Sequence, residues 1–161
     1  LSKIDPGNKY YIYGGSKDFI NIYKRKFANK NIFFHEYIPY KNIKNLLCQM
    51  DLLILPYEKK VTVSGNVGNI ASFTSPMKVF DYMSSSKPII ASSLSVLKEV
   101  LVNKKNCIFV DDLNVYKWKS VIKKILLNNT QRSIISRNNF FLAKNYTYQN
   151  RVRKMFNDIT F

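Results

Sequence analysis

The sequence contains little glycine, proline, cysteine and histidine, and these shortages restrict the function classes to which it can belong. Its 161 residues include 5 glycines, 5 prolines, 2 cysteines and 1 histidine. Two cysteines without metal-ligand spacing build neither a disulfide framework nor a metal site, and a lone histidine excludes a histidine-based metal centre. The sequence has no internal repeat, no low-complexity tract and no apolar run long enough to span a bilayer. No signal peptide is visible, but the chain begins with Leu1 rather than Met, as a fragment of a longer protein would.

The composition predicts one folded domain over residues 1–161. Apolar residues make up 46% of the chain and aromatic residues 14%, which is enough to fill a core at this length. Cys48 and Cys107 both lie in apolar runs, and free cysteine is among the most buried residue types. We therefore expect both thiols in the core of a protein from a reducing compartment.

Basic residues exceed acidic residues by 26 to 10, which gives a net charge of +16. The lysines are scattered, and no run of five or more basic residues marks a nucleic-acid-binding tail. The abundance of Lys, Asn, Ile, Phe and Tyr is also what an A/T-rich genome produces, whatever the function. The alternative is attraction to anionic ligands, namely a nucleotide diphosphate and an acidic membrane leaflet.

Strand-like apolar runs alternate with amphipathic segments up to residue 110. This order predicts an α/β fold, a Rossmann-like parallel sheet with helices on both faces, followed by closing helices. The expected strands are 10–13, 32–34, 52–56, 88–92 and 107–110. The expected helices are 17–27, 43–50, one that begins at Pro76, 96–102, 115–126, 131–146 and a last one capped by Thr147. Residues 59–74, which contain Gly65 and Gly68, predict a loop.

The most informative segment runs from Ser75 to Ser92. Ser75 is a good N-cap, and Pro76 suits the first helical position. The free amides of Met77 and Lys78, together with the lysine charge, would then form a site for an anion such as a diphosphate. Asp81 follows one turn later on the Lys78 side, where its carboxylate could accept hydrogen bonds from a ribose. The alternative for Lys78 is a solvated lysine on the helix face. The alternative for Asp81 is an ordinary acid that the helix dipole favours in the first turn.

This segment resembles the nucleotide-sugar-binding core of GT-B glycosyltransferases of the "glycosyl transferases group 1" family. The positions that match the family pattern are Ser75, Pro76, Lys78, Tyr82, Met83, Lys87, Pro88, Ile89, Ile90 and Ala91. Asp81 stands where the family carries a ribose-binding glutamate. The order of elements resembles the C-terminal, donor-binding half of these enzymes, with the N-terminal acceptor domain and the first strand absent.

Three positions depart from the family pattern. Phe73 stands where many members carry a second glutamate that contacts the donor sugar, and Asp81 is one methylene shorter than glutamate. Ser86 replaces the glycine that ends the helix, where a residue with a β-carbon in the αL conformation costs about 1 kcal/mol. These departures put turnover in more doubt than nucleotide binding.

Further site residues follow from the rule that ligands sit beyond the carboxyl ends of parallel strands. Gly14 and Gly15 come directly after the first strand and would let backbone approach the nucleotide, or would form a simple turn. The resemblance implies that backbone groups of Tyr37 and Ile38 read the base; the alternative for Tyr37 is an exposed loop aromatic. His35 has a structural role by this interpretation. Glu36 and Glu58 are surface acids by the same interpretation.

The resemblance implies transfer of a sugar, of the hexosyl type, from a nucleotide-sugar to a hydroxyl of a glycan or lipid-linked acceptor. It implies no metal or other cofactor, a role in cell-envelope polysaccharide synthesis, no nucleic-acid partner, and a cytoplasmic location with peripheral contact at the inner face of the membrane. The chain alone would be inactive without the N-terminal half. Two rivals remain: a non-catalytic or degenerate nucleotide-sugar-binding partner subunit, and a basic module that binds anionic surfaces.

Overall fold

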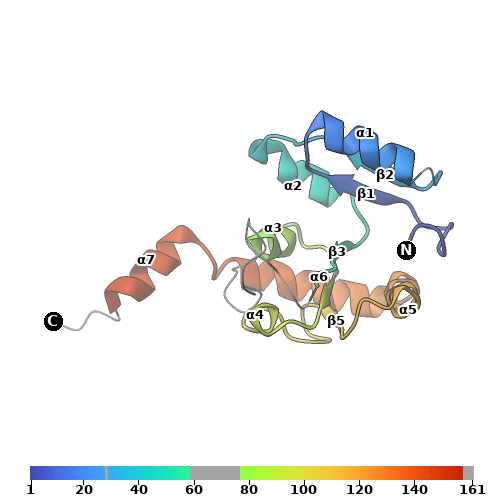
Figure 1. Ribbon diagram of the computed structural model, residues 1–161. Helices are drawn as coiled ribbons and strands as arrows, with labels where there is room; N and C mark the ends of the chain where they lie inside the picture. The colour runs from blue at the N-terminus through green and yellow to red at the C-terminus, as the bar shows by residue number, and fades with distance from the viewer. Residues whose placement is uncertain (28, 59–76, 158–161) are drawn as a thin grey trace.

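The computed structural model of the chain describes residues 1–27, 29–58 and 77–157 (Figure 1). Strands and helices alternate up to β5, and helices alone follow. The elements are β1 (Tyr10–Tyr13), α1 (Lys17–Lys26), β2 (Ile32–His35), α2 (Tyr40–Cys48), β3 (Leu53–Leu55), α3 (Lys78–Ser84), β4 (Ile89–Ser92), α4 (Ser95–Lys98), β5 (Ile108–Val110), α5 (Val115–Leu127), α6 (Asn129–Ala143) and α7 (Tyr148–Asn157). The predicted α/β class is confirmed. The predicted loop 59–74 lies outside the described residues.

All strand pairs in the described chain are parallel, but they form two sheets rather than one. β1 pairs with β2, with Tyr10 opposite Ile32, while β3, β4 and β5 form a second sheet in that order. The β1–β2 pair lies with α1 and α2 in one part of the molecule, and the three-stranded sheet lies with α3 to α6 in another (Figure 1). Within the described residues, β1 and β3 therefore each pair with a strand on one side only.

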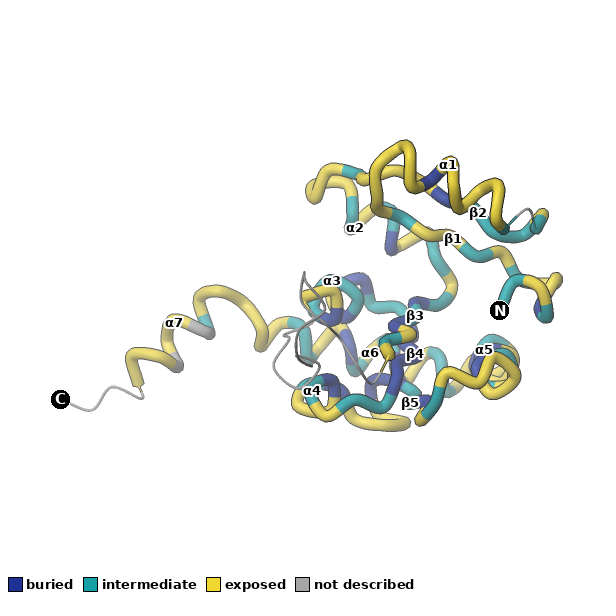
Figure 2. The backbone as a smooth tube through the Cα atoms, in the orientation of Figure 1, coloured by how far each residue is buried: buried dark blue, intermediate teal, exposed yellow. Residues whose placement is uncertain are grey.

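The three-stranded sheet is covered on both faces, as its uninterrupted apolar sequence predicts for a central parallel strand. All four residues of β4 are buried. On one face, Ile90 packs in a cluster with Trp118 and Ile122 of α5 and Ile135 of α6. On the other face, Ile89 and Ala91 belong to a second cluster, whose helical members are Val79, Met83 and Leu97. Alternate residues of one strand therefore point into two different cores, which places α3 firmly against the sheet. The backbone of β4 is accordingly coloured as buried in Figure 2.

The smaller sheet is held by aromatic packing. Phe34 of β2 is buried, and its ring lies 5.9 Å from the ring of Tyr23 and 6.3 Å from that of Phe27, at the end of α1. Tyr11 and Phe33 have ring centroids 5.1 Å apart and are stacked. Because α1 covers this sheet through only a few side chains, much of its apolar surface remains open.

Several predicted boundaries and one burial prediction are wrong. α2 begins at Tyr40, directly after Pro39, rather than at residue 43, and α4 ends at Lys98, short of the predicted 102. Cys107 is buried as expected, but Cys48 is exposed. The physical reason lies in the register of α2, whose buried residue is Leu47, so that the next position along the helix turns toward solvent.

Other local predictions are confirmed. Ser86 has φ 58°, the left-handed conformation expected where the family has glycine. The Thr147 hydroxyl accepts a hydrogen bond from the amide of Asn150 at 3.2 Å, which caps the start of α7. α7 projects away from the rest of the described chain (Figures 1 and 2). No helix of the described residues has the length and apolarity needed to cross a bilayer.

Candidate nucleotide-sugar site

The candidate site centres on the start of α3. Lys78 is its first residue and is exposed, and Asp81 lies one turn further on. Met77 already has helical dihedral angles, and its carbonyl accepts a hydrogen bond from the amide of Phe80 at 3.1 Å. The helical backbone therefore extends back to Met77. Ser75 and Pro76, the predicted cap and first helical residue, lie outside the described residues.

The start of α3 can interact favourably with an anion for a general reason. The first amides of an α-helix have no partner within the helix, and the helix dipole places partial positive charge there. Lys78 adds a full positive charge at the same end. Since residues i and i+3 lie on neighbouring positions of the helix surface, the Lys78 ammonium and the Asp81 carboxylate can face one extended ligand.

Asp81 is also tied to a part of the chain that the sequence did not associate with it. The Tyr40 hydroxyl donates a hydrogen bond of 2.9 Å to Oδ1 of Asp81, and the pKa of Tyr40 is raised by this bond. Tyr40 is the first residue of α2, which packs against α3. A carboxylate has about four lone-pair sites, so Asp81 retains capacity to accept from a ligand while it holds Tyr40. Sequence reasoning missed Tyr40 because no local pattern links residues 41 positions apart.

The far end of α3 is fixed by α6. Asn139 of α6 is completely buried, and its side-chain amide donates a 3.0 Å hydrogen bond to the carbonyl of Lys87, between α3 and β4. The positive φ of Ser86 makes the tight turn that brings the chain to this bond. The helix that carries Lys78 and Asp81 is therefore anchored at its end by a buried polar contact as well as by Val79 and Met83 on its inner face.

The glycine pair follows β1 as expected. Gly14 and Gly15 have φ 113° and 101°, conformations that residues with a β-carbon rarely adopt. A β-carbon at Gly14 would meet no atom within 4 Å, so the backbone angle rather than space requires glycine there. Ser16 then caps α1 by accepting from the amide of Phe19.

Tyr37 and Ile38 follow β2, and the Tyr37 side chain is 73% exposed. Among the described residues, no hydrogen bond joins Tyr37, Ile38 or the glycine pair to Lys78 or Asp81. His35 and the acids near it show no catalytic arrangement: the His35 ring stacks on Tyr13 at 4.5 Å, and Glu36 and Glu58 are exposed. The described chain contains no group of three acidic, His or Cys side chains that could hold a metal ion.

A cavity of about 240 Å³ opens at the carboxyl ends of the three-stranded sheet, the edge at which parallel sheets bind ligands. Its lining comes from the segments that follow β3, β4 and β5, and comprises Tyr57, Ser92, Ser93, Leu94, Asp111, Asp112 and Leu113. Tyr57 also packs against the core cluster that contains Val79 and Met83 of α3. Tyr57 therefore links the cavity wall to the core on which α3 packs.

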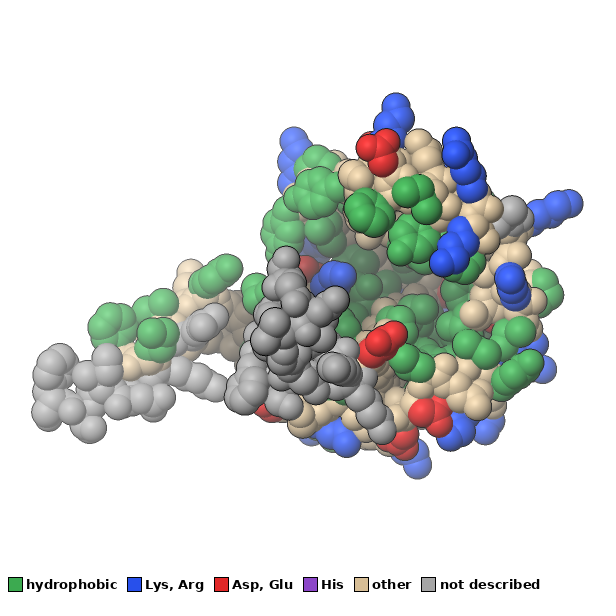
Figure 3. All heavy atoms as spheres, viewed as in Figure 1, with side chains coloured by type: hydrophobic (Ala, Val, Ile, Leu, Met, Phe, Trp, Pro, Cys, Tyr) green, Lys and Arg blue, Asp and Glu red, His purple; other side chains and the backbone are tan. Residues whose placement is uncertain are grey.

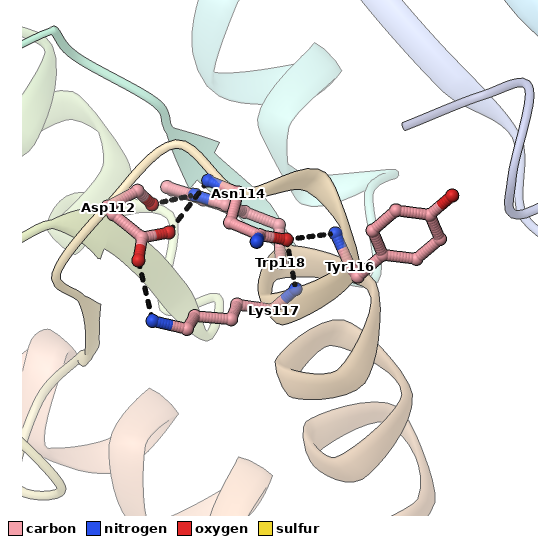
Figure 4. A network of polar contacts seen from close by, with 5 residues as sticks. All are labelled: Asp112, Asn114, Tyr116, Lys117 and Trp118. Carbon is pink, nitrogen blue, oxygen red and sulfur yellow. Dashed lines mark hydrogen bonds and ion pairs between the residues drawn. The ribbon is translucent and has the colours of Figure 1, made fainter.

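One wall of the cavity is held by the polar network in Figure 4. Asp112 accepts from Lys117 Nζ at 2.6 Å and from the amide of Asn114 at 2.7 Å, and its carbonyl accepts from the Trp118 indole at 2.8 Å. Asn114 in turn caps α5 by accepting from the amide of Tyr116 at 2.9 Å. Asp112 raises the pKa of Lys117, which stays charged. The network fixes the turn after β5, which contributes Asp111, Asp112 and Leu113 to the lining of the cavity.

Comparison with known sequences identifies the family. Residues 1–140 match the profile described as "Glycosyl transferases group 1". The chain belongs to this family. It is a glycosyltransferase group 1 domain with a Rossmann-like fold of the GT-B type. No curated protein matches the sequence.

Solved glycosyltransferase structures share the fold at low sequence identity. HepE from Anabaena in complex with UDP and glucose superposes with a TM-score of 0.73 at 13% identity. The superposition covers 99% of this chain and 43% of the HepE chain. A glycosyltransferase from Rickettsia africae gives a TM-score of 0.72 at 17% identity, with 98% and 41% coverage. TarM from S. aureus, in a complex that includes UDP, gives 0.69 at 17% identity, with 97% and 30% coverage. The chain thus spans less than half the length of these relatives.

Proposed function

We propose that this chain is the donor-binding half of a glycosyltransferase that takes a nucleotide-activated sugar at the start of α3. The observation that carries the proposal is the placement of Lys78 and Asp81 on one side of a firmly anchored helix in a glycosyltransferase group 1 domain. An ammonium beside free helix amides fits a diphosphate, and a carboxylate one turn away fits the vicinal hydroxyls of a ribose.

The proposed mechanism assigns each group a separate task. The amides at Met77 and the Lys78 ammonium stabilise the negative charge that develops on the leaving diphosphate as the glycosidic bond breaks. Asp81 orients the ribose, with backbone groups at Tyr37 and Ile38 against the base and Gly14–Gly15 close to the nucleotide. Ser75 and Pro76 would complete the anion site. This scheme requires no metal ion, because the lysine and the helix end supply the positive charge.

The structural relatives support a uridine nucleotide as the first donor to test. HepE has been crystallised with UDP-glucose, and TarM with UDP. We therefore propose a hexosyltransferase with a UDP-hexose donor. We further propose that the acceptor is a glycan or a lipid-linked sugar of a cell-envelope polysaccharide, reached from the cytoplasm with peripheral contact at the inner membrane face.

We also propose that transfer requires a second domain for the acceptor. The whole of residues 1–161 is one nucleotide-sugar-binding domain in this proposal. Two observations support it: the chain spans 43% or less of the solved relatives, and β1 and β3 each pair on only one side within the described residues. A further strand between the two sheets would join them. The isolated chain would bind donor without turnover.

A non-catalytic nucleotide-sugar-binding subunit is the second candidate. It is favoured by Phe73, which stands where many members of the family carry a glutamate that contacts the donor sugar. Both candidates bind a donor nucleotide, and they differ only in whether sugar is transferred once a second domain is present.

Titration calorimetry with UDP, GDP and ADP tests nucleotide binding. We expect the wild-type chain to bind at least one of them, and Lys78→Ala to weaken binding by about tenfold or more, as loss of a charge-assisted contact implies. Lys123→Ala removes the same charge from an exposed position in α5 and should change affinity by less than about twofold. Absence of binding to a folded sample at millimolar nucleotide, or equal losses in the two variants, would refute the site.

A further inference from the structure

The outer face of α1 exposes large apolar side chains that no described element covers. Phe19 is 60% exposed, Ile22 is 59% exposed and Tyr23 is 42% exposed. The inner face of the same helix is occupied by Ile20, which is buried, while Tyr23 and Phe27 reach the Phe34 ring only along one side. Packing onto β2 therefore explains why Ile20 and Phe27 are apolar. It does not explain why the exposed residues Phe19 and Ile22 are apolar.

These two apolar residues are neighbours of the cations of α1. Phe19 and Ile22 lie three positions apart, and Arg25 and Lys26 lie three and four positions beyond Ile22, so all four share one side of the helix. The ten residues of α1 contain four basic side chains against Asp18 alone. Among the described residues, no ion pair involves any of these cations. The α1 surface in Figure 3 accordingly shows hydrophobic side chains bordered by lysine and arginine side chains.

An apolar stripe bordered by unpaired cations is typical of a helix that lies in the interface of an anionic membrane. The apolar side chains enter the boundary between headgroups and acyl chains, and the cations remain at headgroup level, where long basic side chains extend easily. A protein partner would cover Phe19 and Ile22 equally well, but it would have to neutralise the same cations. The net charge of +16 repels a second copy of this chain and favours an acidic surface.

We propose that α1 is a membrane-docking surface, in which Phe19 and Ile22 insert into the interface and Arg25 and Lys26 bind anionic lipid headgroups. The proposal rests on the peripheral membrane contact of the proposed function and names the surface for it, and it uses none of the residues assigned to nucleotide binding. It adds the surface through which the chain would approach a lipid-linked acceptor. The docked helix begins directly after the Gly14–Gly15 turn, on the carboxyl side of β1, so the donor site would lie near the bilayer.

The experiment is co-sedimentation of the full chain with vesicles. One set contains phosphatidylcholine alone, and the other contains about 30 mol% phosphatidylglycerol, at about 0.15 M salt. The test variants are Phe19→Ala/Ile22→Ala, which removes the apolar pair, and Arg25→Gln/Lys26→Gln, which removes the charges. The matched controls are Ile134→Ala/Phe140→Ala, an exposed apolar pair in α6, and Lys123→Gln/Lys124→Gln, an exposed basic pair in α5.

We expect binding to the anionic vesicles and little to phosphatidylcholine alone. Arg25→Gln/Lys26→Gln should lower the partition coefficient by about 25-fold, since each cation near an anionic surface contributes about fivefold. Phe19→Ala/Ile22→Ala should lower it by about tenfold or more through the lost apolar contacts, and the controls should change it by less than about threefold. Circular dichroism and UDP calorimetry on the same variants show that the fold and the donor site are intact. A folded variant that binds vesicles but no nucleotide would count against the proposed function alone.

Three results would overturn the docking proposal. No binding of the folded wild type to anionic vesicles would remove it outright. Equal losses in the α1 and α5 basic variants would show a diffuse electrostatic attraction instead of a docking helix. Unchanged vesicle binding by Phe19→Ala/Ile22→Ala would show that these side chains stay outside the bilayer, which would leave a protein partner as the reason for their exposure.

Discussion

The hydroxyl of Tyr40 donates a 2.9 Å hydrogen bond to the carboxylate of Asp81 and so links the start of α2 to the first turn of α3. The two helices come from different halves of the described chain: α2 follows the two-stranded sheet, and α3 precedes the central strand of the other. The bond therefore fixes the orientation of the Asp81 carboxylate, which is proposed to bind the ribose, through a residue that belongs with the other sheet. It also makes Tyr40 a positioning residue for that ligand.

Tyr40→Phe tests this role. Loss of a hydrogen bond to an exposed carboxylate should cost little stability, but it frees Asp81 to adopt other rotamers. We expect UDP to bind about two- to fivefold more weakly to the variant, by calorimetry, with the melting temperature nearly unchanged. Tyr116→Phe, which alters another exposed tyrosine, serves as the control. Tighter binding by Tyr40→Phe would contradict a positioning role and show that Tyr40 competes with the ribose.

Asp81→Asn tests the ribose assignment itself. A carboxylate that accepts from two vicinal hydroxyls makes charge-assisted bonds, and their loss should cost about 1.5–3 kcal/mol of binding free energy. The variant should therefore bind UDP more weakly by about tenfold or more, and its affinity for a 2′,3′-dideoxy analogue should hardly change. If both ligands lose affinity equally, Asp81 acts on the structure of the site and not on the ribose.

The two cysteines differ in a way that thiol labelling can detect. Burial raises the pKa of Cys107 to about 12, so its thiol stays protonated and enclosed at pH 8, whereas Cys48 is exposed. Because the thiolate is the reactive form, a disulfide reagent at pH 8 should modify one cysteine in the folded protein and both in denaturant. Cys48→Ser should abolish the fast reaction. Fast labelling of two thiols in the native protein would show that the core around Cys107 opens.

Much of the fold could be predicted from the sequence because its central elements carry unambiguous local signals. Ile89, Ile90 and Ala91 form an apolar run, and all of β4 (Ile89–Ser92) proved buried; Ser86 adopts the left-handed conformation that the helix end requires. Helix boundaries were less predictable. At α2 the helix starts directly after Pro39, which lies outside it with ψ 140°, whereas the apolar pattern begins only at Ile43.

The division into two sheets and the Tyr40–Asp81 contact could not be predicted, since both depend on long-range geometry. An apolar strand shows the same pattern whether it has one neighbour or two, so β1 and β3 gave no sign of being edge strands. The exposure of Cys48 could not be predicted from local sequence either. Cys48 follows the apolar residues Leu46 and Leu47, but the orientation of α2 turns its side chain outward. The contribution of Asp111 to the cavity likewise appears only when the end of β5 meets the ends of β3 and β4.

The stripe on α7 allows a last prediction, about assembly. Four apolar side chains spaced along α7 form this stripe, and all are exposed, with Tyr148 at 82%, Val152 at 48%, Met155 at 60% and Phe156 at 69%. Contiguous apolar side chains of this kind usually mark an interaction surface. We therefore expect the isolated chain to self-associate in spite of its charge, and co-expression with a second glycosyltransferase domain to relieve this.

Light scattering behind a sizing column measures the effect. Met155→Ser/Phe156→Ser should shift the chain toward monomer, because it removes two of the most exposed apolar side chains while changing no charge. Ile134→Ser/Phe140→Ser, at exposed apolar positions of α6, is the matched control and should leave the association unchanged. A wild-type chain that is monomeric at high concentration would show that α7 needs no partner, and sugar transfer by that monomer would show that the acceptor domain is not required.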